Sequence, residues 1–124
     1  MKIIKRNRKF VVGKKKNIVL KDKGSLFLEN NENISIHFNK KINYDIVRKN
    51  WGFYCLPSIN KRLLKFKLKA LITENKRTKS FFIMLIVNNK KSLKEFKAYC
   101  LKEDLRIITW LSKKNLNKIK NIFD

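Results

Sequence analysis

The sequence predicts a single α+β domain over residues 1–124, in which an N-terminal antiparallel β-meander is followed by a helix, a β-hairpin, a helix, a strand and a C-terminal helix. Two patterns indicate this class. Short runs of alternating apolar and polar residues dominate the first part of the chain, and apolar residues at helical spacing appear near its end. Because 44% of the residues are hydrophobic and only three are glycine and one is proline, we expect regular elements around a real hydrophobic core.

The N-terminal meander is expected between residues 17 and 38. Its three short strands are joined by tight turns and lie at residues 18–20, 25–29 and 34–38. Gly24 lies in the first turn, where it would supply a positive φ. Ahead of the meander, residues 10–12 form a short strand between two basic clusters. This charged stretch is either a solvated face or a mobile arm that seeks RNA or lipid.

The middle of the chain combines a polar stretch with an aromatic one. Residues 39–50 form a polar connector, which marks a sub-boundary within the domain. The densest aromatic cluster follows at residues 51–56. Pro57 suits the first turn of a helix, which we expect to continue through residues 58–64.

A β-hairpin is expected after this helix. In residues 66–72 apolar side chains alternate with lysines, which indicates a half-buried strand with a Lys-rich outer face. Residues 74–79 form the loop. Residues 81–87 are apolar throughout, as in a central strand covered on both faces.

The C-terminal part reads as helix, strand and helix. Ser92 and Glu95 match the capping box, in which the serine hydroxyl and the glutamate carboxylate each satisfy a backbone N–H. The first helix runs to about residue 102 and is followed by a strand at residues 105–111. Ser112 then caps the last helix. The side chains expected to face the core from the two helices are Leu93, Phe96, Cys100, Leu116, Ile119 and Phe123.

The charge is extreme, with 32 Lys and Arg against nine Asp and Glu and a formal net charge of +23. An A/T-rich genome would explain the preference for Lys (26) over Arg (6), but it would not explain the shortage of acids. A surface that binds a polyanion would explain that shortage, with RNA as the simplest partner. The polyanion-binding candidates are the N-terminal cations Lys5, Arg6, Arg8, Lys9, Lys14, Lys15 and Lys16.

One stretch combines aromatic and basic side chains in the way that single-stranded nucleic-acid sites do. It runs from Trp51 to Leu64. The ligand-binding candidates are Trp51, Tyr54, Asn60, Lys61 and Arg62. The alternative is that Trp51, Phe53, Ile59 and Leu63 are simply core residues.

The residues give little support to catalysis. His37 is the only histidine, and we expect it at the surface of a strand rather than acting as a general base. Cys55 and Cys100 are expected to be buried thiols of a reducing cytoplasm. No spacing for a metal site and no glycine-rich phosphate loop is present, so we expect no metal and no cofactor. No signal peptide or membrane-spanning run is recognisable, which favours a cytoplasmic location.

The stretch Lys49-Asn50-Trp51-Gly52-Phe53-Tyr54, followed by Pro57-Ser58-Ile59-Asn60-Lys61-Arg62-Leu63, resembles a motif in small uncharacterised bacterial proteins encoded among surface-polysaccharide biosynthesis genes. The likeness extends loosely through residues 66–87 and the strand with Ile107, Trp110 and Leu111. The family has no activity that assigns a catalytic residue. The resemblance implies a cytoplasmic accessory protein of surface-glycan biosynthesis that binds an anionic sugar nucleotide or a partner enzyme near Tyr54, Asn60 and Arg62.

Three hypotheses follow. The first is a small non-catalytic protein that binds a polyanion, with affinity that falls steeply as salt rises. The second is the accessory role that the resemblance implies. The third and least favoured is a small sugar-modifying enzyme that uses His37.

Overall fold

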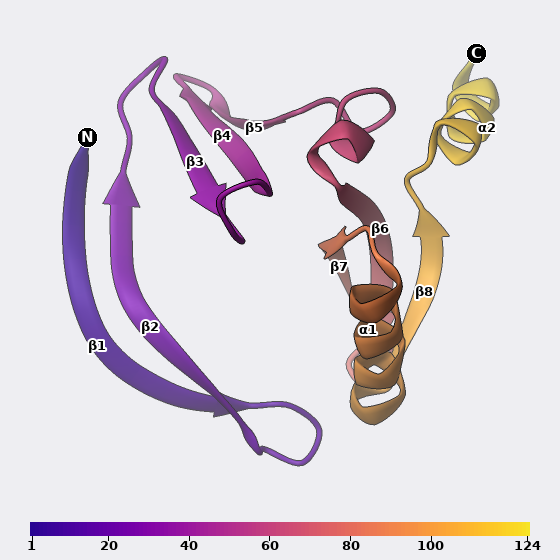
Figure 1. Ribbon diagram of the computed structural model, residues 1–124, viewed down its shortest axis with the longest axis horizontal. Helices are drawn as coiled ribbons and strands as arrows, with labels where there is room; N and C mark the ends of the chain where they lie inside the picture. The colour runs from indigo at the N-terminus through magenta and orange to yellow at the C-terminus, as the bar shows by residue number, and fades with distance from the viewer.

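The computed structural model describes residues 1–124 and confirms a mixed α+β architecture. Its eight strands form three separate small sheets with the orders β1-β2, β3-β4-β5 and β7-β6-β8. Both α-helices come late in the chain, and the termini lie on opposite sides of the molecule (Figure 1). The predicted element order is therefore wrong in the first half of the chain, where strands replace the connector and the first helix.

The N-terminal sheet is a long curved ribbon of two antiparallel strands, β1 (Lys2–Val12) and β2 (Ile18–Phe27) (Figure 1). Of the two alternatives for the N-terminal basic stretch, the structure shows an exposed, paired strand and not a mobile arm, and the first two strands of the predicted meander are one continuous strand. Gly24 lies inside β2 opposite Lys5, with φ +140°, at the irregularity in the register. A Cβ at Gly24 would come within 2.1 Å of the Ile4 carbonyl oxygen, so the glycine permits a close approach of the strands rather than a turn.

The second sheet contains β3 (Asn33–His37), β4 (Asn43–Lys49) and β5 (Gly52–Leu56), with β4 in the centre. The predicted polar connector at residues 39–50 is therefore wrong. Ile42 and Val47 are buried there, so the stretch contributes to the core. The aromatic cluster at residues 51–56 forms the turn after β4 and the edge strand β5.

The predicted helix at residues 57–64 is absent. Turns follow Pro57, and a single 3₁₀ turn, η1 (Leu63–Phe66), precedes the next strand. Lys67 ends it in the left-handed conformation, with φ 59°. Leu63 is almost fully buried and packs with Ile42, so this segment links the second and third sheets.

The third sheet confirms the predicted hairpin and the predicted last strand. It contains β6 (Leu68–Asn75), β7 (Ser80–Val87) and β8 (Leu105–Trp110). The roles of the hairpin strands are exchanged, however, because β6 is the buried central strand and the apolar β7 is an edge.

Helix α1 (Lys90–Glu103) packs on this sheet through Phe96 and Cys100, as expected. Its N-cap is Asn89, whose side chain accepts from the Ser92 N–H at 2.7 Å, so the capping box predicted at Ser92 is wrong.

Helix α2 (Lys113–Phe123) is capped by Ser112, as predicted. It has no buried residue: of its predicted inward side chains Leu116 is half-buried, whereas Ile119 and Phe123 are exposed. Neither helix has the length and apolar character needed to cross a membrane.

The core is far smaller than expected. Only 13 of 124 residues are buried. Five of them form a cluster around Leu63 and three form another around Leu71. The accessible surface is 9913 Å². A compact monomer of 14.9 kDa would expose about 7,000 Å², so the chain exposes roughly 2,900 Å² more than its mass predicts.

Candidate nucleic-acid interface

The ribbon β1–β2 carries all seven N-terminal cations that the sequence singles out, but it gives them different roles. Arg6 and Arg8 each place a guanidinium nitrogen 2.9 Å from Asp22 Oδ2. The hydrogen bond from Arg6, assisted by the Gly24 N–H, holds the pKa of Asp22 below its usual value. These two arginines are therefore partly neutralised within the ribbon.

Lys14 anchors the tip of the ribbon to the end of α1. Its backbone N–H donates to Glu103 Oε1 at 2.7 Å, and its ammonium group lies 2.8 Å from Asp104 Oδ2. The Lys14 ammonium lowers the pKa of Asp104. Lys14 thus fixes the direction of the ribbon, whereas its neighbours Lys15 and Lys16 meet no carboxylate.

The remaining lysines of the ribbon repel one another. Lys9 lies directly opposite Lys21 in the strand register, and both are exposed. Lys23 lies two residues further along β2 and so on the same face. Like charges directly opposite in a ladder destabilise a sheet, and no carboxylate lies between these two. This face of the ribbon is suited to an anion.

The turn between β4 and β5 presents two stacked aromatic rings to solvent. The ring centroids of Trp51 and Tyr54 are 6.3 Å apart, with 18° between the planes. Trp51 is 72% exposed, and Phe53 and Ile59 are exposed as well, so of the four side chains that the alternative placed in the core only Leu63 is buried. The high exposure leaves Trp51 accessible to a further stacked ring.

Two cations precede the turn, Lys49 on the face of the sheet that carries Tyr54 and Arg48 on the face that carries Phe53. Arg48 and Lys49 end β4, and their head groups bind the amide oxygens of Asn50 and Asn31 rather than carboxylates. The neighbouring Glu32 is itself paired with the N-terminal ammonium at 3.2 Å. Hydrogen bonds from the Glu29 N–H and this ammonium lower the pKa of Glu32. The sequence did not predict Arg48 and Lys49 as site residues, because its polar pattern indicates a connector over residues 39–50 rather than the strand β4.

The other predicted ligand residues lie apart from the aromatic pair. Lys61 is exposed in the turn before η1, and the Arg62 guanidinium lies 5.9 Å from the centroid of the Phe66 ring. Asn60 lines a pocket that includes neither Trp51 nor Tyr54. The structure therefore separates the five residues: Trp51 and Tyr54 lie together, Asn60 lines the pocket, and Lys61 and Arg62 belong to neither group.

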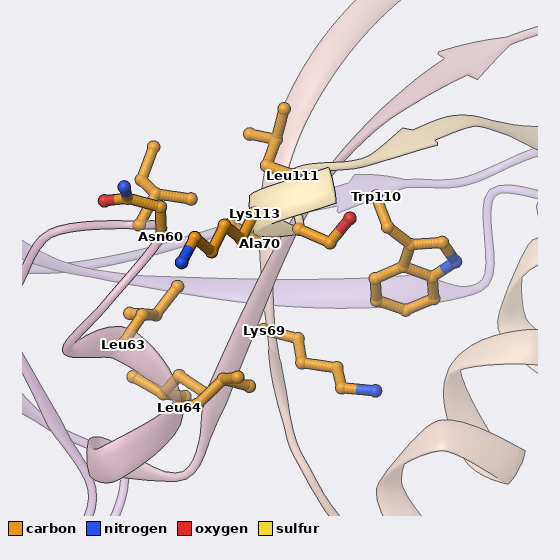
Figure 2. A pocket seen from close by; sticks show the side chains of 11 residues that line it. Asn60, Leu63, Leu64, Lys69, Ala70, Trp110, Leu111 and Lys113 are labelled. Atoms are coloured by element: carbon orange, nitrogen blue, oxygen red, sulfur yellow. The ribbon is translucent and has the colours of Figure 1, made fainter. Parts of the chain in front are cut away.

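The pocket has a volume of about 270 Å³ and mostly apolar walls. Figure 2 shows Lys113 extending toward Asn60 on one side, while Lys69 and Trp110 lie together on the other. The Lys69 ammonium is 5.6 Å from the centroid of the Trp110 ring. The size fits one ring rather than a whole nucleotide. No sequence pattern had linked Lys69, Trp110 and Lys113.

The other side chains that could take part in a reaction are the single histidine, the two cysteines and Tyr44. His37 is exposed at the end of β3, with its ring Nδ1 3.3 Å from the Asn39 carbonyl oxygen, as expected for a surface histidine. Cys55 is exposed on the edge strand β5, so its predicted burial is wrong, whereas Cys100 is buried as predicted. Burial, and secondarily Cys55, raise the pKa of Tyr44 to about 12. No group of three potential metal ligands occurs.

No family model, no curated protein and no solved structure matches this chain.

Proposed function

We propose that this protein binds single-stranded RNA through the aromatic tip at Trp51 and Tyr54 and through the Lys-rich face of the β1–β2 ribbon. The observation that carries the proposal is the exposed, stacked ring pair together with Lys49, which lies on the same face of the sheet as Tyr54 and meets no carboxylate. Single-stranded nucleic-acid sites combine these two features, because a base offers a π-face and its phosphate offers a charge.

The charge balance supports a polyanionic ligand. Only five of the 32 Lys and Arg residues contact a carboxylate, namely Arg6, Arg8, Lys14, Arg77 and Arg106. The other 27 carry the same charge on a protein of only 124 residues, so they repel one another. A bound polyanion removes this repulsion and releases counterions from its own phosphates.

The aromatic tip distinguishes RNA from other polyanions. Polyphosphate and sulfated glycans have no planar rings to stack on Trp51, so they would use the lysines alone. Base stacking on an aromatic side chain contributes about 1–3 kcal/mol per base, which is roughly fivefold to 150-fold in Kd.

The test compares two ligands and two variants. We expect Trp51→Ala to weaken the binding of oligouridine by about tenfold, within the range for one stacked base, and to leave the binding of polyphosphate unchanged. Phe123→Ala is the matched control, because it removes an aromatic ring that is 83% exposed at the other end of the molecule. Fluorescence anisotropy with labelled ligands measures each Kd.

Two results would contradict the proposal. One is an equal loss of affinity for both ligands in Trp51→Ala, which would mean that the ring acts through the fold rather than by stacking. The other is the same effect in Phe123→Ala. Far-UV circular dichroism of each variant checks that the strands are intact.

A second candidate is the accessory role in surface-glycan biosynthesis, and the pocket beside Asn60 favours it. A Trp ring, two lysines and an amide around a cavity of about 270 Å³ suit one sugar ring or base of an anionic sugar nucleotide. Calorimetric titration with a nucleoside diphosphate sugar separates the two candidates. Saturable heat that Asn60→Ala abolishes, together with no binding of RNA, would favour the second.

A further inference from the structure

Strand β7 has an unpaired edge. The sheet order β7-β6-β8 leaves no strand on its outer side (Figure 1). Phe81, Phe82 and Ile83 are exposed there, and Ile83 is 76% exposed although it is one of the most apolar side chains in the protein. Since successive side chains point to opposite faces of a sheet, neither face is covered at this end of the strand.

The edge also lacks the features that keep such strands apart in solution. Ser80–Val87 contains no charged residue, no proline and no register irregularity, although charged residues make up 33% of the chain. Soluble proteins usually place lysine, proline or a bulge on an exposed edge, because its free N–H and C=O groups recruit other strands. A long, apolar, regular edge is therefore expected to be covered in the working protein.

We propose that β7 pairs with β7 of a second copy, antiparallel and around a two-fold axis perpendicular to the sheet. The two sheets would join into one of six strands, with both α1 helices on the same face. A two-fold contact uses the same surface on both partners, so that surface must be complementary to itself. An apolar antiparallel strand meets this condition.

Charge favours a second copy over an acidic protein. An acidic partner strand would find no cation on β7 to pair with, and the two residues that follow, Asn88 and Asn89, are neutral as well. Two copies of net charge +23 repel one another, so a contact between them must use a region free of lysine. β7 provides such a region over eight residues, between Lys79 and Lys90, whereas the other uncharged edge strands, β3 and β5, have only five residues each.

The chain as a whole has exposed surface to spare for a contact with a second copy. A standard interface buries about 800 Å² per partner, and the chain exposes roughly 2,900 Å² more than a compact protein of its mass. Pairing at β7 would use part of this excess and none of the residues that the proposed RNA site names. Dimerisation through β7 is thus independent of RNA binding.

The experiment is sedimentation equilibrium of nuclease-treated protein at about 0.1 and 1 M salt, where the Debye length falls from about 10 to 3 Å. We expect twice the mass of 14.9 kDa, with tighter association at the higher salt because the repulsion is screened. Ile83→Lys should weaken dimerisation at least about tenfold, since it would bring a like charge from each copy to the paired strands. Ile122→Lys is the matched control, because it changes an isoleucine with the same 76% exposure on α2.

A monomer at both salt concentrations overturns the proposal, as does a dimer that Ile83→Lys leaves intact or that Ile122→Lys disrupts equally. Phe81→Lys provides a second test at another exposed position of the strand, and it should act like Ile83→Lys. Circular dichroism and a thermal melt of each variant distinguish loss of the interface from loss of the fold.

Discussion

Lys9 and Lys21 show how single residues can favour the bound state over the free protein. They face each other across the β1–β2 ladder without a carboxylate between them. In the free protein this pair is repulsive, and in a complex both side chains would contact phosphate. The position therefore opposes folding stability, and in the proposed complex it would favour binding.

Lys9→Glu separates these two effects. We expect the variant to melt at a higher temperature than the wild type, because the carboxylate attracts Lys21 across the strands. We expect weaker RNA binding and a shallower dependence on salt, because the variant loses a phosphate contact. A thermal melt and anisotropy titrations at several salt concentrations measure both.

Lys90→Glu is the control for the change in net charge, since Lys90 lies at the start of α1, far along the chain from the ribbon. A Lys9→Glu protein that is less stable than the wild type, or that binds RNA as the wild type does, contradicts this account of the ribbon.

At the scale of elements, the β1–β2 ribbon is held in place relative to α1 by the contacts of its tip. Two strands with no third partner are marginally stable in water, and the ribbon has almost no buried residues. The Lys14 N–H bond to Glu103 and the Lys14–Asp104 ion pair tie it to α1. Glu103 is 7% exposed, so the hydrogen bond is shielded from water.

Glu103→Ala should therefore loosen the ribbon. It leaves the Lys14 N–H without its acceptor, and losing a partner of a buried donor costs about 1–3 kcal/mol. We expect faster hydrogen exchange of the β1 and β2 amides, while β6 exchanges as in the wild type. Glu95→Ala on the same helix is the control, because Glu95 is exposed and has no ion pair. If the β1 amides exchange as slowly in Glu103→Ala as in Glu95→Ala, the contact at the tip does not hold the ribbon in place.

The sequence predicted elements well where local patterns decide them. The hairpin at β6 and β7, the strand β8 and the Ser112 cap all follow from residues within a few positions of one another. β4 was missed because lysine and asparagine flank it, although Ile42, Tyr44 and Ile46 alternate with Asn43 and Asp45 as in a half-buried strand.

Properties that depend on distant contacts were not predictable. An apolar run is typical of a central strand, yet β7 is an edge, and no local signal in Ser80–Val87 reveals what pairs beside it. The exposure of Trp51 and Cys55 has the same origin, because the sheet that holds them has little to pack against. Similarly, Asn60 was grouped with Trp51 by closeness in sequence, but it lies in a pocket formed with β6 and α2.

The whole molecule combines a small core, a large surface and a charge of +23. The excess surface of roughly 2,900 Å² reflects the arrangement of the strands in three separate small sheets with few buried residues. The two proposed contacts divide this surface between them, with β7 against a second copy and the ribbon and aromatic tip against RNA. They should respond to salt in opposite directions, because salt screens the repulsion between copies but competes with phosphate contacts.

RNA binding is tested most directly by measuring the affinity of the nuclease-treated protein for a random-sequence single-stranded RNA at about 50 and 200 mM salt. Five phosphate contacts would weaken binding roughly 100-fold over this range. Tight binding at the lower salt that falls in this way is the predicted result. No binding at the lower salt, or an affinity that salt leaves unchanged, would contradict the account and would assign the excess of lysine to the composition of the genome.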